Sequence, residues 1–235
     1  MIKPLIAFIL VSAPCAGMAQ SAQERWTFAD WTQCNIGDVS VCTRLIDLGN
    51  LTAENLVLAH NARGNAYAAK GDFDRAIEDH NKAIELDPNP NRVAIAYNNR
   101  GRDYAGKGSL NQAIADFGKA IEINPVFADA YYNRGVSYRS KGDLDRAIAD
   151  YSGAIKLNPQ YAAAYNNRGT AYSKSGHLAE AIMDFTHAIE INPRYANAYY
   201  NRSIAYAMKG ERDLSSSDYA KAVELDPRIA TLPRN

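Results

Sequence analysis

The chain has 235 residues, of which 26 are lysine or arginine and 26 are aspartate or glutamate, so its formal net charge is zero. Proteins that bind the phosphate backbone of nucleic acids usually carry a clear excess of positive charge. This composition therefore argues against a nucleic-acid partner, and we expect none.

The first 19 residues have the three-part pattern of a secretory signal. Lys3 supplies one positive charge, an apolar run follows, and Gly17 and Ala19 are small residues before a cleavage point. We predict cleavage after Ala19 and export to the periplasm or the medium. The uncharged stretch 4–19 has 16 residues, short of the ~18 to 20 that span a membrane. No transmembrane segment is expected once the signal is removed.

A second interpretation of this segment stays open. Bacterial lipoprotein signals end in a small residue followed by cysteine, and Cys15 would then carry the lipid, although Pro14 before it fits that pattern poorly. A lipid anchor would make the protein a membrane-attached factor for outer-membrane assembly.

Cys34 and Cys42 are the thiols that remain after removal of the signal. In an oxidising compartment an isolated pair most often forms a disulfide, and we predict this bond. It would stabilise the fold by roughly 2 to 3 kcal/mol in the chain-entropy treatment. A redox or metal pair would need a C-x-x-C spacing or nearby His and Cys ligands, and neither is present.

Residues 20–56 are predicted to form an N-terminal cap with a degenerate half-repeat. The segment 42–50 aligns loosely with 80–88, which ends a second helix in the regular pattern that follows. Both tryptophans, Trp26 and Trp31, fall in this cap, as suits a plug over the first full unit, because an end unit lacks one neighbour. Stacking of a sugar on the tryptophans is the alternative.

A unit of 34 residues is then repeated five times. Glycines and prolines recur at this interval, at Gly101, Gly135, Gly169, Pro125, Pro159, Pro193 and Pro227. The units are 57–90, 94–127, 128–161, 162–195 and 196–229, with 91–93 inserted after the first and a short tail, 230–235, after the last.

Each unit is predicted to be a helix, a turn and a second helix. A glycine such as Gly142 follows the first helix and supplies the left-handed residue that ends it. The second helix carries one apolar stripe, as at Ala181, Ile182 and Phe185, and a proline follows its end. The stripe must be buried by packing.

This pattern resembles the tetratricopeptide repeat over residues 57–229. The corresponding places of the central unit hold Tyr131, Arg134, Gly135, Tyr138, Ala147, Tyr151, Ala154 and Pro159. Only the leucine usual at the seventh place is missing, since Arg134 stands there. The resemblance implies an all-α fold, a right-handed superhelical solenoid of antiparallel helix-turn-helix repeats (α-α superhelix), that binds another protein or an extended peptide.

The seventh place is where this chain departs from the family pattern. Arginine stands there in every unit, and aspartate follows sixteen residues later: Arg63 and Asp79, Arg100 and Asp116, Arg134 and Asp150, Arg168 and Asp184, and Arg202 and Asp218. An arginine buried in a leucine place would be costly without a partner. We therefore predict a ladder of ion pairs within or between units.

The resemblance places the inner wall of the superhelix on the first helices, chiefly at places two, five, six, nine, twelve and thirteen of each unit. In this sequence they include Asn61, Asn65, Asn98, Asn99, Arg102, Tyr132, Asn133, Arg139, Asn166, Asn167, Lys174, Asn197, Tyr200, Asn201 and Met208. Amide groups can both donate to and accept from a peptide backbone, so these residues are predicted to form a peptide-binding groove. Alternatively, part of the asparagine column braces neighbouring repeats.

The last unit differs as an end unit should. Ser215 and Ser216 replace an alanine and an isoleucine, and Ser203 replaces a glycine. Because only eight residues follow Pro227, an extra solvating helix is not expected, and end-to-end pairing of two molecules stays open.

The sequence gives no sign of catalysis. The four histidines do not pair at the spacing of a helical metal site, and no nucleophile or phosphate-loop motif is present. We predict a non-catalytic scaffold of the cell envelope with no catalytic residue, metal or cofactor. A lipid-anchored outer-membrane assembly factor and a cell-wall or carbohydrate-binding adaptor are the alternatives.

Overall fold

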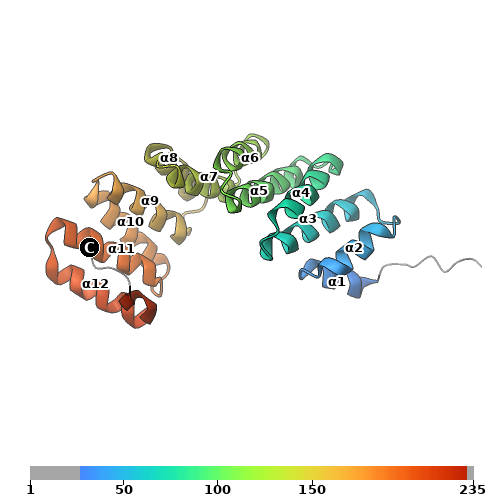
Figure 1. Cartoon of the computed structure of the whole chain (residues 1–235). Coiled ribbons are helices and arrows are strands. Elements are labelled where there is room, and N and C mark those ends of the chain that lie inside the picture. The colour runs from blue at the N-terminus through green and yellow to red at the C-terminus, as the bar shows by residue number, and fades with distance from the viewer. Residues whose placement is uncertain (1–26, 232–235) are drawn as a thin grey trace, which may run out of the picture.

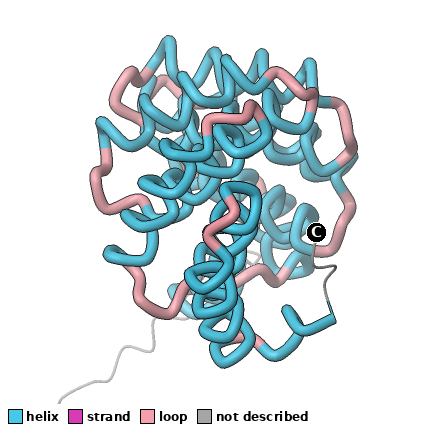
Figure 2. Tube along the Cα trace, turned by 90° about the vertical axis from the view of Figure 1, so that its left-hand side faces the viewer, coloured by secondary structure: helices cyan, strands magenta, loops and turns pink. Residues whose placement is uncertain are grey.

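The fold is known from a computed structural model, and residues 27–231 are described. These residues form twelve α-helices and one short 3-10 helix, with no strand among them, which confirms the predicted all-α solenoid. The helices pair into hairpins that follow one another along an arc (Figure 1). A view turned by 90° shows that the arc also winds round (Figure 2). The predicted signal, Cys15 and Trp26 lie outside the described residues.

A short hairpin opens the array, and five longer ones follow. The cap consists of α1 (Phe28–Asn35) and α2 (Val39–Asp47). The longer hairpins are α3 (Ala53–Ala69) with α4 (Phe73–Leu86), α5 (Pro90–Gly106) with α6 (Leu110–Ile123), α7 (Ala128–Ser140) with α8 (Leu144–Leu157), α9 (Ala162–Lys174) with α10 (Leu178–Ile191), and α11 (Ala196–Lys209) with α12 (Arg212–Leu225). A 3-10 turn, η1 (Pro227–Thr231), packs against α12 and buries Ile229.

The cap is built around its disulfide. The bond joins Cys34 at the end of α1 to Cys42 in α2. Both cysteines and Leu45 are fully buried, and Trp31 packs against them. Trp31 therefore forms part of the cap's own core.

Glycine closes the turn between the two helices of every long hairpin. Gly71, Gly108, Gly142, Gly176 and Gly210 all have φ between 78° and 82°. This left-handed conformation costs other L-residues energy because the Cβ approaches the carbonyl oxygen. The predicted helix-ending role of these glycines is confirmed.

A second set of glycines allows the two helices of a hairpin to approach closely. A Cβ placed on Gly101 would lie 2.7 Å from Phe117, and one on Gly169 would lie 2.8 Å from Phe185. Real side chains do not approach so closely, so the aromatic ring takes the space that a larger residue would need.

The three inserted residues lengthen one helix instead of forming a loop. Helix α5 has 17 residues, begins at Pro90 and is capped by the Asn89 side chain. Arg92, within the insertion, bonds Asp87 at 2.8 Å and Glu54 at 2.6 Å. The extra turn is thereby tied to both helices of the preceding hairpin.

Every arginine of the predicted ladder meets its aspartate. The guanidinium Nε and Nη2 atoms donate to the two carboxylate oxygens of the same unit, at 2.6 to 2.9 Å, in all five pairs. This two-point geometry is the strongest form of the arginine–carboxylate contact. The aspartates are buried and the arginines only slightly exposed, and hydrogen bonding to aspartate raises the pKa of each guanidinium.

The same arginines also reach the preceding hairpin. In four units Nη1 donates to a side chain of the second helix before it: Arg63 to Thr43, Arg100 to Asn81, Arg168 to Ser152 and Arg202 to Thr186. In the remaining unit, Arg134 faces Gly118, which has no side chain to accept a bond. The ladder therefore acts both within and between units.

A histidine–aspartate pair replaces an aromatic contact between the first two long hairpins. His80 Nδ1 lies 2.6 Å from Asp103 Oδ2, and both side chains are buried. The same two places hold Phe185 and Ala205 in a later pair of units, where both belong to one buried cluster. The sequence pattern identified His80 as an aromatic replacement but not its partner on the next hairpin.

We expect loss of one ladder carboxylate to destabilise the array strongly. Asp184→Ala leaves the largely buried Arg168 guanidinium without its partner, at a cost of about 3 kcal/mol in unfolding free energy. Urea denaturation followed by circular dichroism measures this. Glu190→Ala, which removes the exposed partner of His187, is the control and should cost under about 1 kcal/mol. Equal effects would contradict a stabilising ladder.

The His80–Asp103 pair should behave as a coupled unit. Asp103→Ala strands a buried imidazole nitrogen and His80→Phe strands a buried carboxylate, so each should cost about 1 to 3 kcal/mol. The double substitution restores the aromatic–alanine contact of Phe185 and Ala205, and should recover much of the loss. Additive losses in the same denaturation assay would show that the two side chains act independently.

Candidate functional site

The first helix of each long hairpin lies on the inside of the curve. Successive first helices, α3, α5, α7, α9 and α11, contact one another, whereas no comparable contact joins successive second helices in the described part of the chain. A row of hairpins that is closer together on one side must bend toward that side. Figure 1 shows α5 and α7 on the inner side of the arc and α6 and α8 on the outer side. The first helices therefore form the wall of a concave groove.

Part of the predicted asparagine column holds the repeats together. Three side-chain amides donate across consecutive first helices: Asn133 to Asn98 at 3.0 Å, Asn167 to Tyr132 at 2.9 Å and Asn201 to Asn166 at 2.9 Å. Asn98 and Asn166 are only 6% and 5% exposed. These two residues brace neighbouring hairpins, so they are not free to bind a ligand as the sequence alone suggested.

The brace is missing between α3 and α5. The Oδ1 atom of Asn61 is buried there without a hydrogen-bond partner among the described residues. Asn99, at the place that donates in later units, instead lines a cavity of about 320 Å³ between the two helices. The lining of this first groove pocket is Asn65, Ala68, Ala69, Phe73, Asn99, Arg102 and Asp103.

A second groove pocket, of about 310 Å³, lies between α9 and α11. Its lining is Thr170, Ser173, Lys174, Phe185, Asn201, Ile204 and Met208. The two pockets use the same places of the repeat: nine, twelve and thirteen of one first helix, and six and nine of the next. They differ in chemistry, because Asn65, Arg102 and Asp103 make the first polar whereas Ile204 and Met208 make the second apolar.

A group of tyrosines lies around Arg139 near the middle of the array, and Tyr161 and Tyr195 in it precede α9 and α11. The rings of Tyr132 and Tyr161 stack with centroids 4.9 Å apart, and the Tyr161 hydroxyl donates to Asp129 at 2.9 Å. Burial raises the pKa of Tyr132 and of Tyr195, while the Arg139 guanidinium opposes that rise in both. The phenols are therefore neutral at physiological pH, and Arg139 is the charge that they face.

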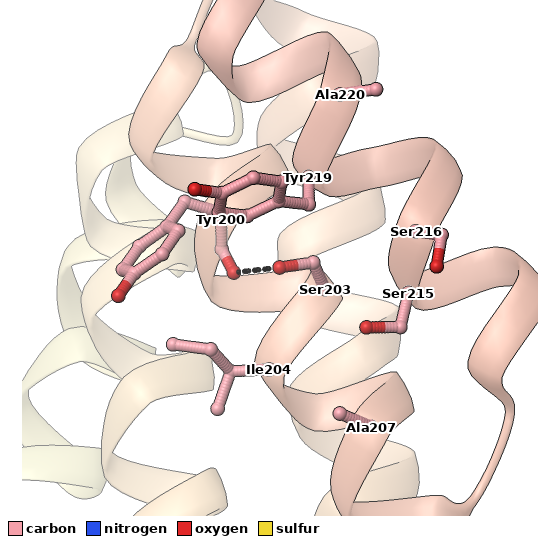
Figure 3. Close-up of a pocket in the computed structure, with 8 residues that line it drawn as sticks. All are labelled: Tyr200, Ser203, Ile204, Ala207, Ser215, Ser216, Tyr219 and Ala220. Atoms are coloured by element: carbon pink, nitrogen blue, oxygen red, sulfur yellow. Dashed lines mark hydrogen bonds between the residues drawn. The ribbon is translucent and has the colours of Figure 1, made fainter. Parts of the chain in front are cut away.

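Tyr200 was predicted to face the groove, but the structure places it at the open C-terminal end. It lines a cavity of about 370 Å³ between α11 and α12, with Ser203, Ile204, Ala207, Ser215, Ser216, Tyr219 and Ala220 (Figure 3). The Ser203 hydroxyl donates to the Tyr200 carbonyl oxygen at 2.7 Å. In an interior unit, the corresponding surface receives the next hairpin, as Ala181 and Phe185 receive Ala205.

Most of the predicted groove residues thus fall into three groups. The first group braces neighbouring hairpins: Asn98, Tyr132, Asn133, Asn166 and Asn167. Asn65, Asn99, Arg102 and Lys174 line the two groove pockets together with Asn201, which also braces. Arg139 faces the central tyrosines. Several lining residues, among them Phe73, Asp103 and Ile204, were not predicted from the sequence, although Ile204 stands at place nine, which the family pattern assigns to the inner wall.

The described residues contain neither a metal-binding cluster nor a helix that could cross a membrane. No group of three or more His, Cys, Asp or Glu side chains in residues 27–231 could hold a metal ion. Within the same range, no helix has the length and apolar character needed to cross a membrane.

Comparison with known proteins identifies the repeat. The chain matches the family described as TPR repeat at residues 101–139 and 137–176, and two families described as tetratricopeptide repeat at 57–90 and 162–195 and at 196–229. No curated protein matches it.

Several solved structures are similar to it. MamA is 32% identical over 72% of this chain and 97% of its own, with a TM-score of 0.63. YrrB, described as a TPR protein with an unusual peptide-binding site, is 25% identical over 82% of this chain and 97% of its own, with a TM-score of 0.62. BtubC from P. vanneervenii shares the fold at 16% identity, with a TM-score of 0.70 and coverage of 89% and 95%. The chain belongs to the tetratricopeptide repeat family.

Proposed function

We propose that this protein is a non-catalytic scaffold of the cell envelope whose concave groove binds an extended segment of another protein. Two pockets in the same register of the repeat, at opposite ends of the groove, carry this proposal. A chain lying along the groove would meet equivalent positions on successive first helices. Protein binding is the usual role of tetratricopeptide repeats, and the description of YrrB names a peptide-binding site in that protein.

The free chemical groups of the groove suit a peptide. Asn65 and Asn99 lie in one pocket, and no hydrogen bond of their side chains to another described residue is found. Each amide can donate to a backbone carbonyl and accept from a backbone N–H. No helix in the described part of the chain lies across the groove, since contacts between elements run only between neighbours along the array.

The envelope location rests on the sequence of residues 1–19 and on the cap. The pattern of that segment is that of an export signal. The Cys34–Cys42 disulfide supports export, because such bonds persist in oxidising compartments and are rare in the reducing cytosol.

Photo-crosslinking should locate partner binding in the groove. A benzoylphenylalanine at Asn65 or Ser140, both exposed on the inner wall, should give a crosslinked partner in cells after irradiation. The same probe at Glu78 or Met183, exposed on second helices, is the matched control and should give none. Mass spectrometry of the products identifies the partner segment. The same partner captured equally from the outer positions would show that the groove is not the binding surface.

Fractionation with thiol labelling tests the location. We expect the protein in the periplasmic fraction, with Cys34 and Cys42 unreactive to a maleimide until a reductant is added. A cytoplasmic protein with free thiols would overturn export. The Cys15→Ala variant should be found in the same periplasmic fraction as the wild type. A wild-type protein found with membranes and released from them by Cys15→Ala would favour the lipid-anchored assembly factor instead.

A further inference from the structure

The exposed charge of the groove is unbalanced although the whole chain is neutral. At places two, five, six, nine, twelve and thirteen of the five units, the charged residues are Arg102, Arg139, Lys174 and Asp129. Asp129 accepts a hydrogen bond from Tyr161. At these places the inner wall thus carries three cations, one on each of α5, α7 and α9, against one anion. Asp103, at place ten, also lines the first groove pocket, but its carboxylate is buried against His80.

These three cations differ from the other basic residues nearby. The arginines of the ladder are each paired with an aspartate. Arg102, Arg139 and Lys174, by contrast, have no carboxylate within ion-pair distance in residues 27–231. Their charges therefore remain available to a ligand, and the low-dielectric walls of a groove strengthen such an attraction.

The second groove pocket adds an apolar requirement beside one of these cations. The buried ring of Phe185 and the side chains of Ile204 and Met208 contribute to its lining, and Lys174 is part of the same lining. Met208 is 58% exposed, and its sulfur accepts a hydrogen bond from the Ser173 hydroxyl of the same pocket at 3.9 Å. A ligand side chain that covered it would remove this apolar surface from water.

We propose that the groove selects an acidic segment that places one large apolar side chain in the pocket between α9 and α11, with a neighbouring carboxylate on Lys174. The remaining acidic residues of the segment face Arg139 and Arg102. The proposal rests on the proposed function, since it specifies the ligand of the same groove.

The polarity of the two pockets also sets where along the groove the apolar residue of the segment lies. An apolar side chain gains little in the first groove pocket, where Asn65, Asn99 and Arg102 are exposed to it. The apolar residue of the ligand therefore lies at the α9 and α11 end, and its more polar part lies toward α3 and α5.

Selection from a random twelve-residue peptide library on the purified protein tests the proposal. Enriched peptides should carry an excess of Asp and Glu around a Leu, Ile, Phe or Met. Fluorescence anisotropy with one enriched peptide should then show an affinity loss of roughly five- to tenfold for Lys174→Glu. Met208→Ala should lose affinity several-fold, and the affinity should fall as salt is added.

Two matched variants serve as controls. Lys156→Glu reverses another exposed lysine on a second helix, and Met183→Ala truncates another exposed methionine outside the groove. Both should bind within about twofold of the wild type, because neither touches the pocket.

The outcomes separate the two proposals. Enrichment of neutral or basic peptides, or equal effects of groove and control variants, overturns the acidic ligand while leaving peptide binding intact. Absence of any enriched peptide, together with no groove-specific photo-crosslink, overturns the binding function itself and the ligand class with it.

Discussion

The array depends on one repeated contact, made by the arginine at the seventh place of each unit. This side chain donates two hydrogen bonds to the aspartate of the same unit and, in four units, a third to the hairpin before it. Its position at a place usually held by leucine means that a charged group substitutes for apolar packing between helices. The contact remains favourable because up to three guanidinium nitrogens find acceptors, as for Arg168 with Asp184 and Ser152. The same side chain therefore contributes both to the packing within a hairpin and to the stacking of that hairpin on the one before it.

Bracing on the inner wall decides which groups are left for a ligand. Once Asn133 bonds Asn98 and Asn201 bonds Asn166, most of the asparagine column is committed to structure. Few groups remain free, and each has a fixed place. Asn65, Asn99 and Arg102 line the first groove pocket, Arg139 faces the tyrosines, and Lys174 lines the apolar pocket. A rigid wall with a few free groups can discriminate between ligands better than a wall of mobile amides, because less side-chain freedom is lost on binding.

Much of the fold could be predicted because it depends on contacts at fixed spacing. The period, the turn glycines and the arginine–aspartate ladder are all visible as residues that recur together, such as Arg134 with Asp150. Other contacts join different units, as Asn201 bonds Asn166 and His80 bonds Asp103. Each of these contacts depends on how far one hairpin is rotated against the next. Sequence spacing does not give that rotation. The same limit applies to Tyr200. Its place in the repeat predicted the groove, but within the described residues no further hairpin packs on it and it lines the end pocket.

The cavities of this chain arise for two different reasons, and only one kind is evidence for a ligand. The end pocket between α11 and α12 is the surface that interior units use to receive the next hairpin, and no further hairpin of the described residues packs on it. Ser215 and Ser216 make it more polar than the equivalent Ala181 and Ile182, as suits a surface in water. The two groove pockets, by contrast, lie between hairpins that pack against each other: one between α3 and α5, the other between α9 and α11. Packing of the repeats does not fill these two pockets, so they are features of the inner wall itself. They are lined by Arg102 and Lys174, the cations that no carboxylate of the described chain neutralises.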